Sequence, residues 1–417
     1  MNARIATVLG LATVLAVSGG CNNGGQHSKH TSEGIKLAQR KINALKSSVE
    51  WETAERQFLA GDLDKSLRTL ERSINITPDV PKCYVLKGRI LIEKGAYEAA
   101  EQCLLTAESL DSTNVDAQYY LGVIGERQSQ FAKALSRYNT AMELDPTSPQ
   151  YVIAASEMYI QLGQVEKGEE LLREKATDFT SNAGIRHALG QLEMLRSQFD
   201  KASEYFNEAR LLAPDDLHVL EDLTRSLIAC RRYGEAEINL AVLLKAPANE
   251  KRSDLQVLRV RCLAAMDRLA EARTLMGTVI TSGGHDSDVS AWILYGNICA
   301  RLEDPVRLRT AVQRITTLAP DRPEGYALRA MLLRMSNQQS AAFQAINTAI
   351  SLNPNDPEQW VIRGLIQAES GEFAQSQRSL RTALRLDAGN ANATTLLNAV
   401  ASLASQPLDT ADATPKN

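Results

Sequence analysis

Apolar residues recur three and four positions apart through most of the chain, and short polar stretches separate these runs. Ala134, Tyr138 and Ala141 follow this spacing, which places their side chains on one face of an α-helix. Proline ends several of the runs, as at Pro146 and Pro214, because it cannot continue a helix. The pattern therefore predicts an all-α fold built from short amphipathic helices.

The helical pattern itself repeats with a fixed period. Residues 120–146 and the segment ending at Pro214 share Leu-Gly, Gln-Phe, Lys-Ala, an aromatic residue, Ala and Leu-x-Pro. Phe131 corresponds to Phe199, an offset of 68 residues, which is twice 34. A period between about 20 and 50 residues is typical of repeat architectures, in which each unit covers the bare face of its neighbour. Repeats are expected to start near residues 47, 81, 115, 149, 183, 217, 253, 289, 323 and 357.

Each copy is expected to be a pair of antiparallel helices joined by a short turn. Small residues such as Gly122 let the two helices approach closely, where a larger side chain would force them apart. The repeats that start near 217 and 253 are 36 residues long, which indicates either longer loops or a kink.

This pattern resembles the tetratricopeptide repeat (TPR), whose signature is W-x2-L-G-x2-Y, then A-x3-F, then A and P. The resemblance implies a right-handed superhelical solenoid of about ten helix-turn-helix repeats with a C-terminal capping helix. The solenoid is expected over residues 35–404, its cap over 389–404, and a polar disordered tail over 405–417. A helix opened by Thr31 or Ser32 is expected to lead into the first repeat.

The N-terminus has the layout of a secretory signal peptide over residues 1–20. Arg4 precedes an apolar run at 5–17, which is shorter than the about 20 residues that span a bilayer. Small residues then lead to Cys21, as in bacterial lipoprotein signals, although Ser18 stands where that family usually has Leu. The resemblance implies lipidation of Cys21, a flexible tether at 21–34, and attachment to the outer membrane facing the periplasm. Cleavage after Ala16-Val17-Ser18 by an ordinary signal peptidase would instead give a soluble periplasmic or secreted protein.

Composition and motifs narrow the function classes. Apolar residues make up 44% of the chain and charged residues 23%, as in ordinary globular folds. The net charge is −4, and acidic and basic residues are interspersed, so no sequence-wide electric field favours nucleic acid as a partner. The common nucleotide-binding, hydrolase, zinc-protease and calcium-loop motifs are absent from the sequence. Repeats fill most of the chain and leave no segment for a catalytic domain. We therefore expect neither enzymatic activity nor a cofactor.

The remaining cysteines and histidines each have two interpretations. Cys83 and Cys103 fall on the two helices of one predicted repeat, where they either form a disulfide or are small core residues. His27 and His30 lie in the expected tether, as weak metal ligands or as solvated side chains.

The loop "SGGHDSD" at 282–288 also has two interpretations. His285, Asp286 and Asp288 either form a small metal or acid/base cluster, or belong to a helix-ending turn in which Asp286 or Ser287 caps the next helix. The loop falls at a repeat junction, which favours the turn, and no metal site is expected.

In the TPR family the first helix of each repeat lines a concave groove, mainly through repeat positions 2, 5, 9, 12 and 13. The groove accepts a helix or an extended segment of a partner, unless adjacent repeats bury these side chains. The carboxylate clamp of chaperone-binding TPRs is not expected, because its positions hold Val85, Arg89, Tyr119, Val123, Ile153 and Glu157. The candidate groove residues are Tyr119, Val123, Ile153, Glu157, Ile160, His187, Gln191, Met194, Leu195, Glu221, Arg225 and Ile228.

The sequence thus predicts a protein-protein interaction scaffold anchored in the bacterial cell envelope, which supports a secretion, pilus, outer-membrane or exopolysaccharide-export complex. The alternatives are a soluble periplasmic or secreted binding module without lipid, a regulatory subunit of an envelope enzyme, and a small-molecule sensor that uses the groove.

Overall fold

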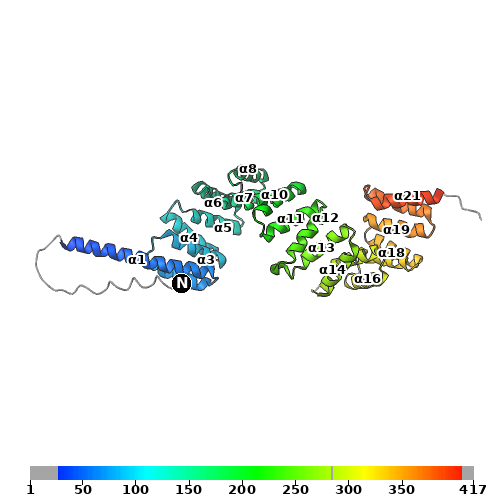
Figure 1. The fold of residues 1–417 in the computed structure, drawn as a ribbon, viewed down its shortest axis with the longest axis horizontal. Coiled ribbons are helices and arrows are strands. Elements are labelled where there is room, and N and C mark those ends of the chain that lie inside the picture. Colours follow the sequence, from blue (N-terminus) through cyan, green and yellow to red (C-terminus); the bar gives the residue numbers. More distant parts are fainter. Residues whose placement is uncertain (1–26, 283–284, 406–417) are drawn as a thin grey trace, which may run out of the picture. The chain divides into compact units, whose positions relative to one another are not determined.

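The computed structural model of the protein describes residues 27–282 and 285–405. Over these residues it consists of α-helices and two short 3₁₀ helices, without a strand (Figure 1). The predicted all-α fold of paired helices is confirmed. The expected signal peptide and Cys21 lie outside the described residues, as does the tail from residue 406. Within the described part, no helix has the length and apolar character needed to cross a membrane.

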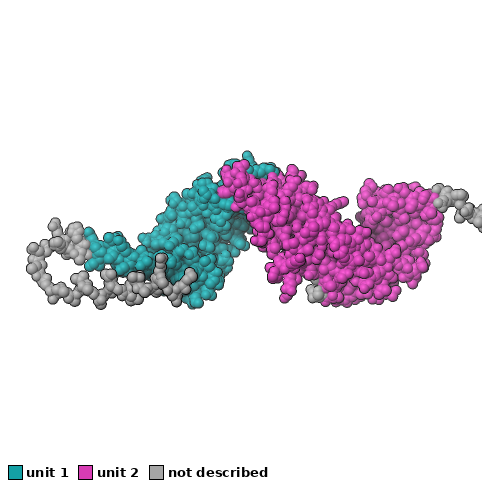
Figure 2. Space-filling view, in the orientation of Figure 1, with its two compact units in different colours: residues 1–175 teal, residues 176–417 magenta. Residues whose placement is uncertain are grey.

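The chain divides into two compact units, residues 1–175 and 176–417 (Figure 2). Consecutive helices in each unit pack against each other as hairpins. Unit 1 contains α1 (His27–Leu59), α2 (Leu63–Ile76), α3 (Pro81–Glu93), α4 (Tyr97–Leu110), α5 (Val115–Arg127), α6 (Phe131–Leu144), α7 (Pro149–Gln161) and α8 (Val165–Ala176), whose last residue crosses the boundary.

Unit 2 continues the same alternation of first and second helices. It contains α9 (Ala183–Leu195), α10 (Phe199–Leu212), α11 (Leu217–Ala229), α12 (Tyr233–Leu243), α13 (Ser253–Ala265), α14 (Leu269–Ser282), α15 (Val289–Arg301), α16 (Pro305–Leu318), α17 (Pro323–Met335), α18 (Gln339–Leu352), α19 (Pro357–Glu369), α20 (Phe373–Leu386) and α21 (Ala391–Ser405).

Every hairpin turns through one residue in the left-handed backbone conformation. This residue is glycine in four turns, as at Gly95 with φ of 72°, and a non-glycine residue in six, as at Ser197 with φ of 58°. Side chains other than glycine reach this conformation at a cost. The ten residues are Gly61, Gly95, Ser129, Gly163, Ser197, Arg231, Asp267, Glu303, Asn337 and Gly371.

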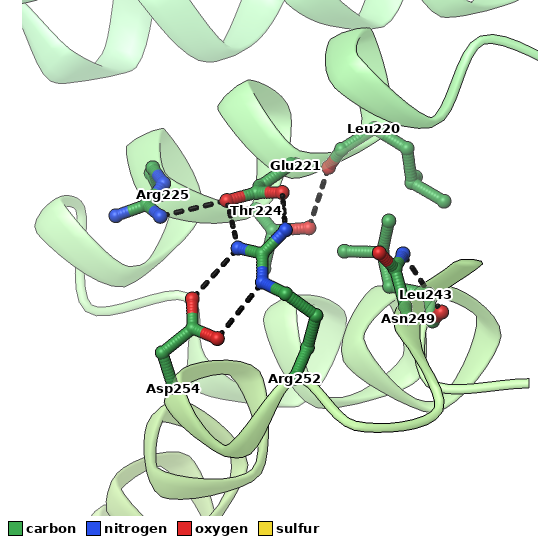
Figure 3. Close-up of polar contacts among 8 residues, drawn as sticks. All are labelled: Leu220, Glu221, Thr224, Arg225, Leu243, Asn249, Arg252 and Asp254. Carbon is green, nitrogen blue, oxygen red and sulfur yellow. Dashed lines mark hydrogen bonds and ion pairs between the residues drawn. The ribbon is translucent and has the colours of Figure 1, made fainter. Parts of the chain in front are cut away.

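The two 36-residue repeats take up their extra residues between hairpins. A 3₁₀ helix, Pro247–Asn249, lies between α12 and α13, and a second one, His285–Ser287, lies between α14 and α15. Asn249 is buried, and its side-chain amide donates to the carbonyl oxygen of Leu243 at 3.1 Å, which fixes the first of these connections (Figure 3). The added length is therefore in the loops.

The first helix differs from the expectation at its start. α1 begins at His27 and not at Thr31 or Ser32, so residues 27–34 of the expected flexible tether are helical. It then runs without a break into the first hairpin, where Ser47 is buried against α2. The Ser47 and Ser73 hydroxyls are 2.8 Å apart at this contact.

Small residues bring the two helices of a hairpin together, as the sequence predicts. A side-chain carbon added at Gly122 would lie 2.4 Å from the ring of Tyr138, and one at Gly190 would lie 2.6 Å from the ring of Phe206. Both rings are almost fully buried. Cys83 and Cys103 are free thiols, Cys83 buried in the core and Cys103 half-buried, and burial raises the pKa of both.

Candidate functional site

The candidate groove residues of unit 1 lie on the first helices α5 and α7. Glu157 is exposed, and the other four residues are half-buried. Tyr119 packs against Tyr138 and Tyr151, with ring centroids 5.7 and 5.6 Å away, and burial raises its pKa. Val123 also packs against the core. Tyr119 and Val123 therefore support the hairpins and present only part of their surface to solvent.

On α9 of unit 2, a polar pair lies beside apolar side chains. His187 Nε2 is 2.8 Å from Asp222 Oδ2 on α11. This hydrogen bond outweighs burial and lowers the pKa of Asp222. Leu195 is 65% exposed, while Met194 packs partly against the core. The surface thus combines a fixed polar pair with an accessible apolar residue.

On α11, Glu221 and Arg225 belong to a network of ion pairs (Figure 3). Glu221 accepts from Arg225 at 2.7 Å and from Arg252 at 3.0 Å. Arg252 also donates both its Nε and an Nη to the two carboxylate oxygens of Asp254, at 2.8 and 2.7 Å. Burial alone would raise the pKa of Glu221, but the hydrogen bonds from the two arginines lower it. These charges compensate one another within the chain.

None of the twelve candidate side chains is buried, and Gln191, like Glu157, is exposed. Four of them, Tyr119, Val123, Met194 and Ile228, nevertheless pack against core clusters. Five of the twelve lie in unit 1 and seven in unit 2.

A hollow on a first-helix face lies near the C-terminal end of unit 2. Its volume is about 770 Å³, and α15, α17, α19 and α21 line it. Its wall is mainly apolar. The apolar lining residues are Ala300, Ala327, Leu328, Met331, Val361, Ile362, Leu365, Leu396 and Ala399. We call this hollow the C-terminal groove.

One buried polar side chain lines the C-terminal groove without full hydrogen bonding. Gln359 is 1% exposed, and its Nε2 donates to Asp356 Oδ2 at 3.1 Å. Its carbonyl oxygen, Oε1, has no hydrogen-bond partner among the described residues. A buried acceptor without a donor costs about 1–3 kcal/mol, so this oxygen is an unfavourable feature of the groove wall.

Charged groups around the C-terminal groove are mostly acidic. Glu324, Asp356 and Glu358 lie at its edge. Glu324 accepts two hydrogen bonds from Arg322, at 3.1 and 2.9 Å, which compensate its charge, whereas Glu358 accepts one from the neutral Asn390 at 2.7 Å. Arg301 donates to Asp267 at 2.8 Å, so its charge is compensated. The edge therefore favours a segment that carries lysine or arginine.

The twelve candidate residues end at the sixth repeat and so do not include this groove, although the same repeat positions line it. Positions 2, 5 and 9 of the repeat starting at 323 are Glu324, Ala327 and Met331, and all three line the groove. Applying the positions beyond the sixth repeat would have found these residues, but not the unpaired Gln359 oxygen.

Within the loop at 282–288, the described residues 286–288 lead into α15 and cap it. Asp288 accepts from the backbone N–H groups of Ser290 and Ala291, at 2.9 and 3.3 Å, and caps α15. The cap is therefore Asp288, not Asp286 or Ser287 as expected. The Asp286 carboxylate pairs with Arg314. Among the described residues no cluster of three metal-ligating side chains occurs, and the side chains of His27, His30 and His285 lie outside them.

Part of the chain is similar in sequence to known repeat proteins. A family model described as "TPR repeat" matches residues 88–129. Tetratricopeptide repeat protein 21B of Xenopus laevis is 26% identical over 231 residues, which is 53% of this chain and 17% of that protein. TPR repeat-containing protein YpiA of Bacillus subtilis is 26% identical over 152 residues, 35% of this chain and 34% of that protein. The chain thus spans only a small part of these relatives.

Solved TPR structures resemble the chain weakly. A tetratricopeptide repeat protein from Parabacteroides merdae aligns at 15% identity and a TM-score of 0.38, covering 78% of this chain and 99% of that one. The Cut9–Hcn1 complex aligns at 11% identity and a TM-score of 0.43, covering 90% and 94%. The repeats of this chain are similar to TPRs in sequence and in their all-helical hairpins.

Proposed function

We propose that the protein is a non-catalytic scaffold that binds segments of other proteins along the first-helix faces of its repeats. The C-terminal groove is the observation that carries this proposal. It joins an apolar wall to an acidic edge. An extended or helical segment with apolar side chains and a basic residue would fit both.

The chemistry of the groove supports binding over catalysis. Its lining contains no histidine, cysteine or lysine, so it lacks the usual pairing of a nucleophile with a general base. The acidic groups at its edge each accept a hydrogen bond from a neighbouring side chain. The arrangement fits recognition of a partner.

We further propose that a lipid on Cys21 anchors this scaffold to the bacterial cell envelope, where it supports assembly of an envelope complex. The support is the signal-like pattern of residues 1–21. A diacyl or triacyl group would give stable attachment, which one chain would not. A soluble periplasmic or secreted module is the second candidate. The mass of the mature N-terminal peptide distinguishes them: a diacylglycerol-modified Cys21 supports the anchor, and an unmodified N-terminus overturns it.

Capture of partners from detergent-solubilised envelopes tests the scaffold. We expect the double variant Leu365→Asp/Ala399→Asp to lose partners that the unchanged protein retains, because it places two carboxylates on the apolar wall. Ile153→Asp/Ile160→Asp/Met194→Asp tests the candidate residues of the earlier repeats in the same way. Val306→Asp is the matched control, because Val306 is 73% exposed on the second helix α16. Equal partner recovery from all variants would contradict the groove assignment.

A further inference from the structure

The first turns of α1 extend beyond the other helices of unit 1 (Figure 1). Residues 32–42 are all exposed, and burial against α2 is first seen at Ser47. An isolated helix shorter than about 12–15 residues is marginal in water. The helical conformation of this segment would therefore be stabilised by a surface that packs against one of its faces.

An apolar stripe runs along this projecting part of α1. Ile35, Ile42, Leu45 and Val49 are 65%, 47%, 68% and 54% exposed, and Ala38 lies between them in the stripe. At 3.6 residues per turn, the five positions fall within about 80° of the helix circumference. Ser47, which faces α2, lies on the opposite side. The described residues of unit 1 therefore leave the stripe uncovered.

Basic side chains accompany the stripe. Residues 32–49 contain Lys36, Arg40, Lys41 and Lys46 against the single acid Glu33, a local charge of +3 (4 − 1), whereas the whole chain carries −4. Lys41 and Lys46 flank the stripe on its two sides, at about 80° and 60° from its centre. The structure gives none of the four cations an ion-pair partner among the described residues.

We propose that this part of α1 lies in the surface of an anionic lipid membrane. Its apolar stripe enters the boundary between headgroups and acyl chains, and the Lys41 and Lys46 stems extend along the apolar surface so that their ammonium groups meet lipid phosphates. Each lysine near an anionic surface contributes about 1 kcal/mol. The contact uses described residues alone and does not require the acyl group proposed at Cys21.

A second copy of the chain fits the stripe less well. Ile35, Ile42 and Val49 occupy a positions of a heptad and Leu45 a d position, a pattern that would suit a parallel pair. Lys41 and Lys46 then occupy g and e positions, where the lysines of two copies would face and repel each other. The stripe is also only about two heptads long, below the three to four that indicate a coiled coil. The same charges attract an anionic surface.

Vesicle flotation tests the proposal with a chain that begins at Asn22, because every described helix and contact lies beyond this residue. The vesicles contain phosphatidylcholine alone or mixed with phosphatidylglycerol. We expect binding only to the mixed vesicles, falling as salt rises from about 0.05 to 0.5 M. Lys41→Gln/Lys46→Gln should weaken binding about 30-fold, as the loss of two lysines implies. Ile42→Asp/Leu45→Asp should reduce binding to the background level.

Val306→Asp is the control for an added surface carboxylate, and circular dichroism verifies that each variant is folded. Equal binding to both vesicle types, or unchanged binding by Ile42→Asp/Leu45→Asp, would overturn the membrane contact. Analytical sedimentation tests the rival occupant, a second copy of the chain. If the unchanged protein is a dimer that does not bind vesicles, and Ile42→Asp/Leu45→Asp is a monomer, the stripe is a dimer contact. Vesicle binding by this stripe depends neither on a lipid at Cys21 nor on partners of the C-terminal groove. The membrane contact and the proposed scaffold function can therefore fail independently.

Discussion

Single residues set how closely the helices of a hairpin approach. Gly190 contacts the ring of Phe206, which is 1% exposed, and Gly122 contacts Tyr138 in the same way. The aromatic ring fills the space that a side chain would need. Sequence reasoning finds these glycines from their repeat positions, but only the packed structure identifies which ring each one meets.

The variant Gly190→Ala should lower the free energy of unfolding by about 1–3 kcal/mol, because its methyl group would lie 2.6 Å from the Phe206 ring. Gly277→Ala is the control, since the nearest atom to an added carbon there, the Tyr295 hydroxyl oxygen, is 4.0 Å away. This change should stabilise α14 by about 0.5–1 kcal/mol, because alanine favours helix interiors. Urea unfolding measures both, and equal effects would contradict the packing argument.

Asp222 provides a prediction of pH dependence. The hydrogen bond from His187 lowers its pKa in the folded state. Because the pKa of Asp222 is lower in the folded state, its ionised form stabilises the fold at pH values above its unfolded-state pKa of about 4. This stabilisation is lost as the pH falls through its folded-state pKa. Asp222→Asn should therefore destabilise the protein near neutral pH by less than about 1 kcal/mol, since Asp222 is partly solvated.

The difference between Asp222→Asn and the unchanged protein should shrink as the pH falls to about 3, as followed by urea unfolding. Asp215→Asn is the control, because Asp215 is exposed and its side chain forms no hydrogen bond or ion pair with the described residues. A difference that stays constant from neutral to acid pH would show that Asp222 contributes through its shape and not its charge.

At the scale of elements, the hairpin turn is the most regular feature of the chain. Ten turns place one residue in the left-handed conformation, although only four of them use glycine. The turn geometry is therefore imposed by the packing of the two helices it joins. The repeat pattern predicts a short turn at each place, but not a strained backbone at serine, arginine, aspartate, glutamate and asparagine.

Replacing Ser197 by glycine should stabilise unit 2 by about 1 kcal/mol, because Ser197 has φ of 58° and glycine reaches this conformation without strain. Gly371→Ala should destabilise it by about 1–2 kcal/mol. No atom lies within 4 Å of a carbon added at Gly371, so this loss would come from the backbone alone. Thermal unfolding measures the stability of both variants. Changes in unfolding temperature of the same sign would contradict the role of left-handed backbone strain.

At the scale of the whole molecule, neighbouring hairpins pack against each other within each unit, so the stability of a unit is a sum of local contributions. The α21 helix closes the described array by covering α19 and α20. Val400 is 1% exposed in that contact, beside the buried Leu380 and Ala383. A substitution that unfolds α21 should therefore leave the distant helices of unit 2 folded.

Val400→Asp should release α21 locally, since it buries a carboxylate in an apolar contact. Hydrogen exchange should accelerate at least about tenfold in α21 while α9 to α12 stay unchanged. Leu403→Asp is the control on the same helix, because Leu403 is 48% exposed. Faster exchange throughout unit 2 would show that the array unfolds as one cooperative body.

The sequence by itself determined the all-α class, the repeated helix pair and the small residues at helix contacts. These features depend on side-chain size and on spacings of three, four and 34 residues, which are local properties. Tertiary structure decided which surfaces remain open. The unpaired Gln359 oxygen, the pairing of Glu221 with Arg252 and the uncovered stripe of α1 depend on what neighbouring helices cover. Glu221 and Arg252, for example, are 31 residues apart in the chain and meet only in the folded structure.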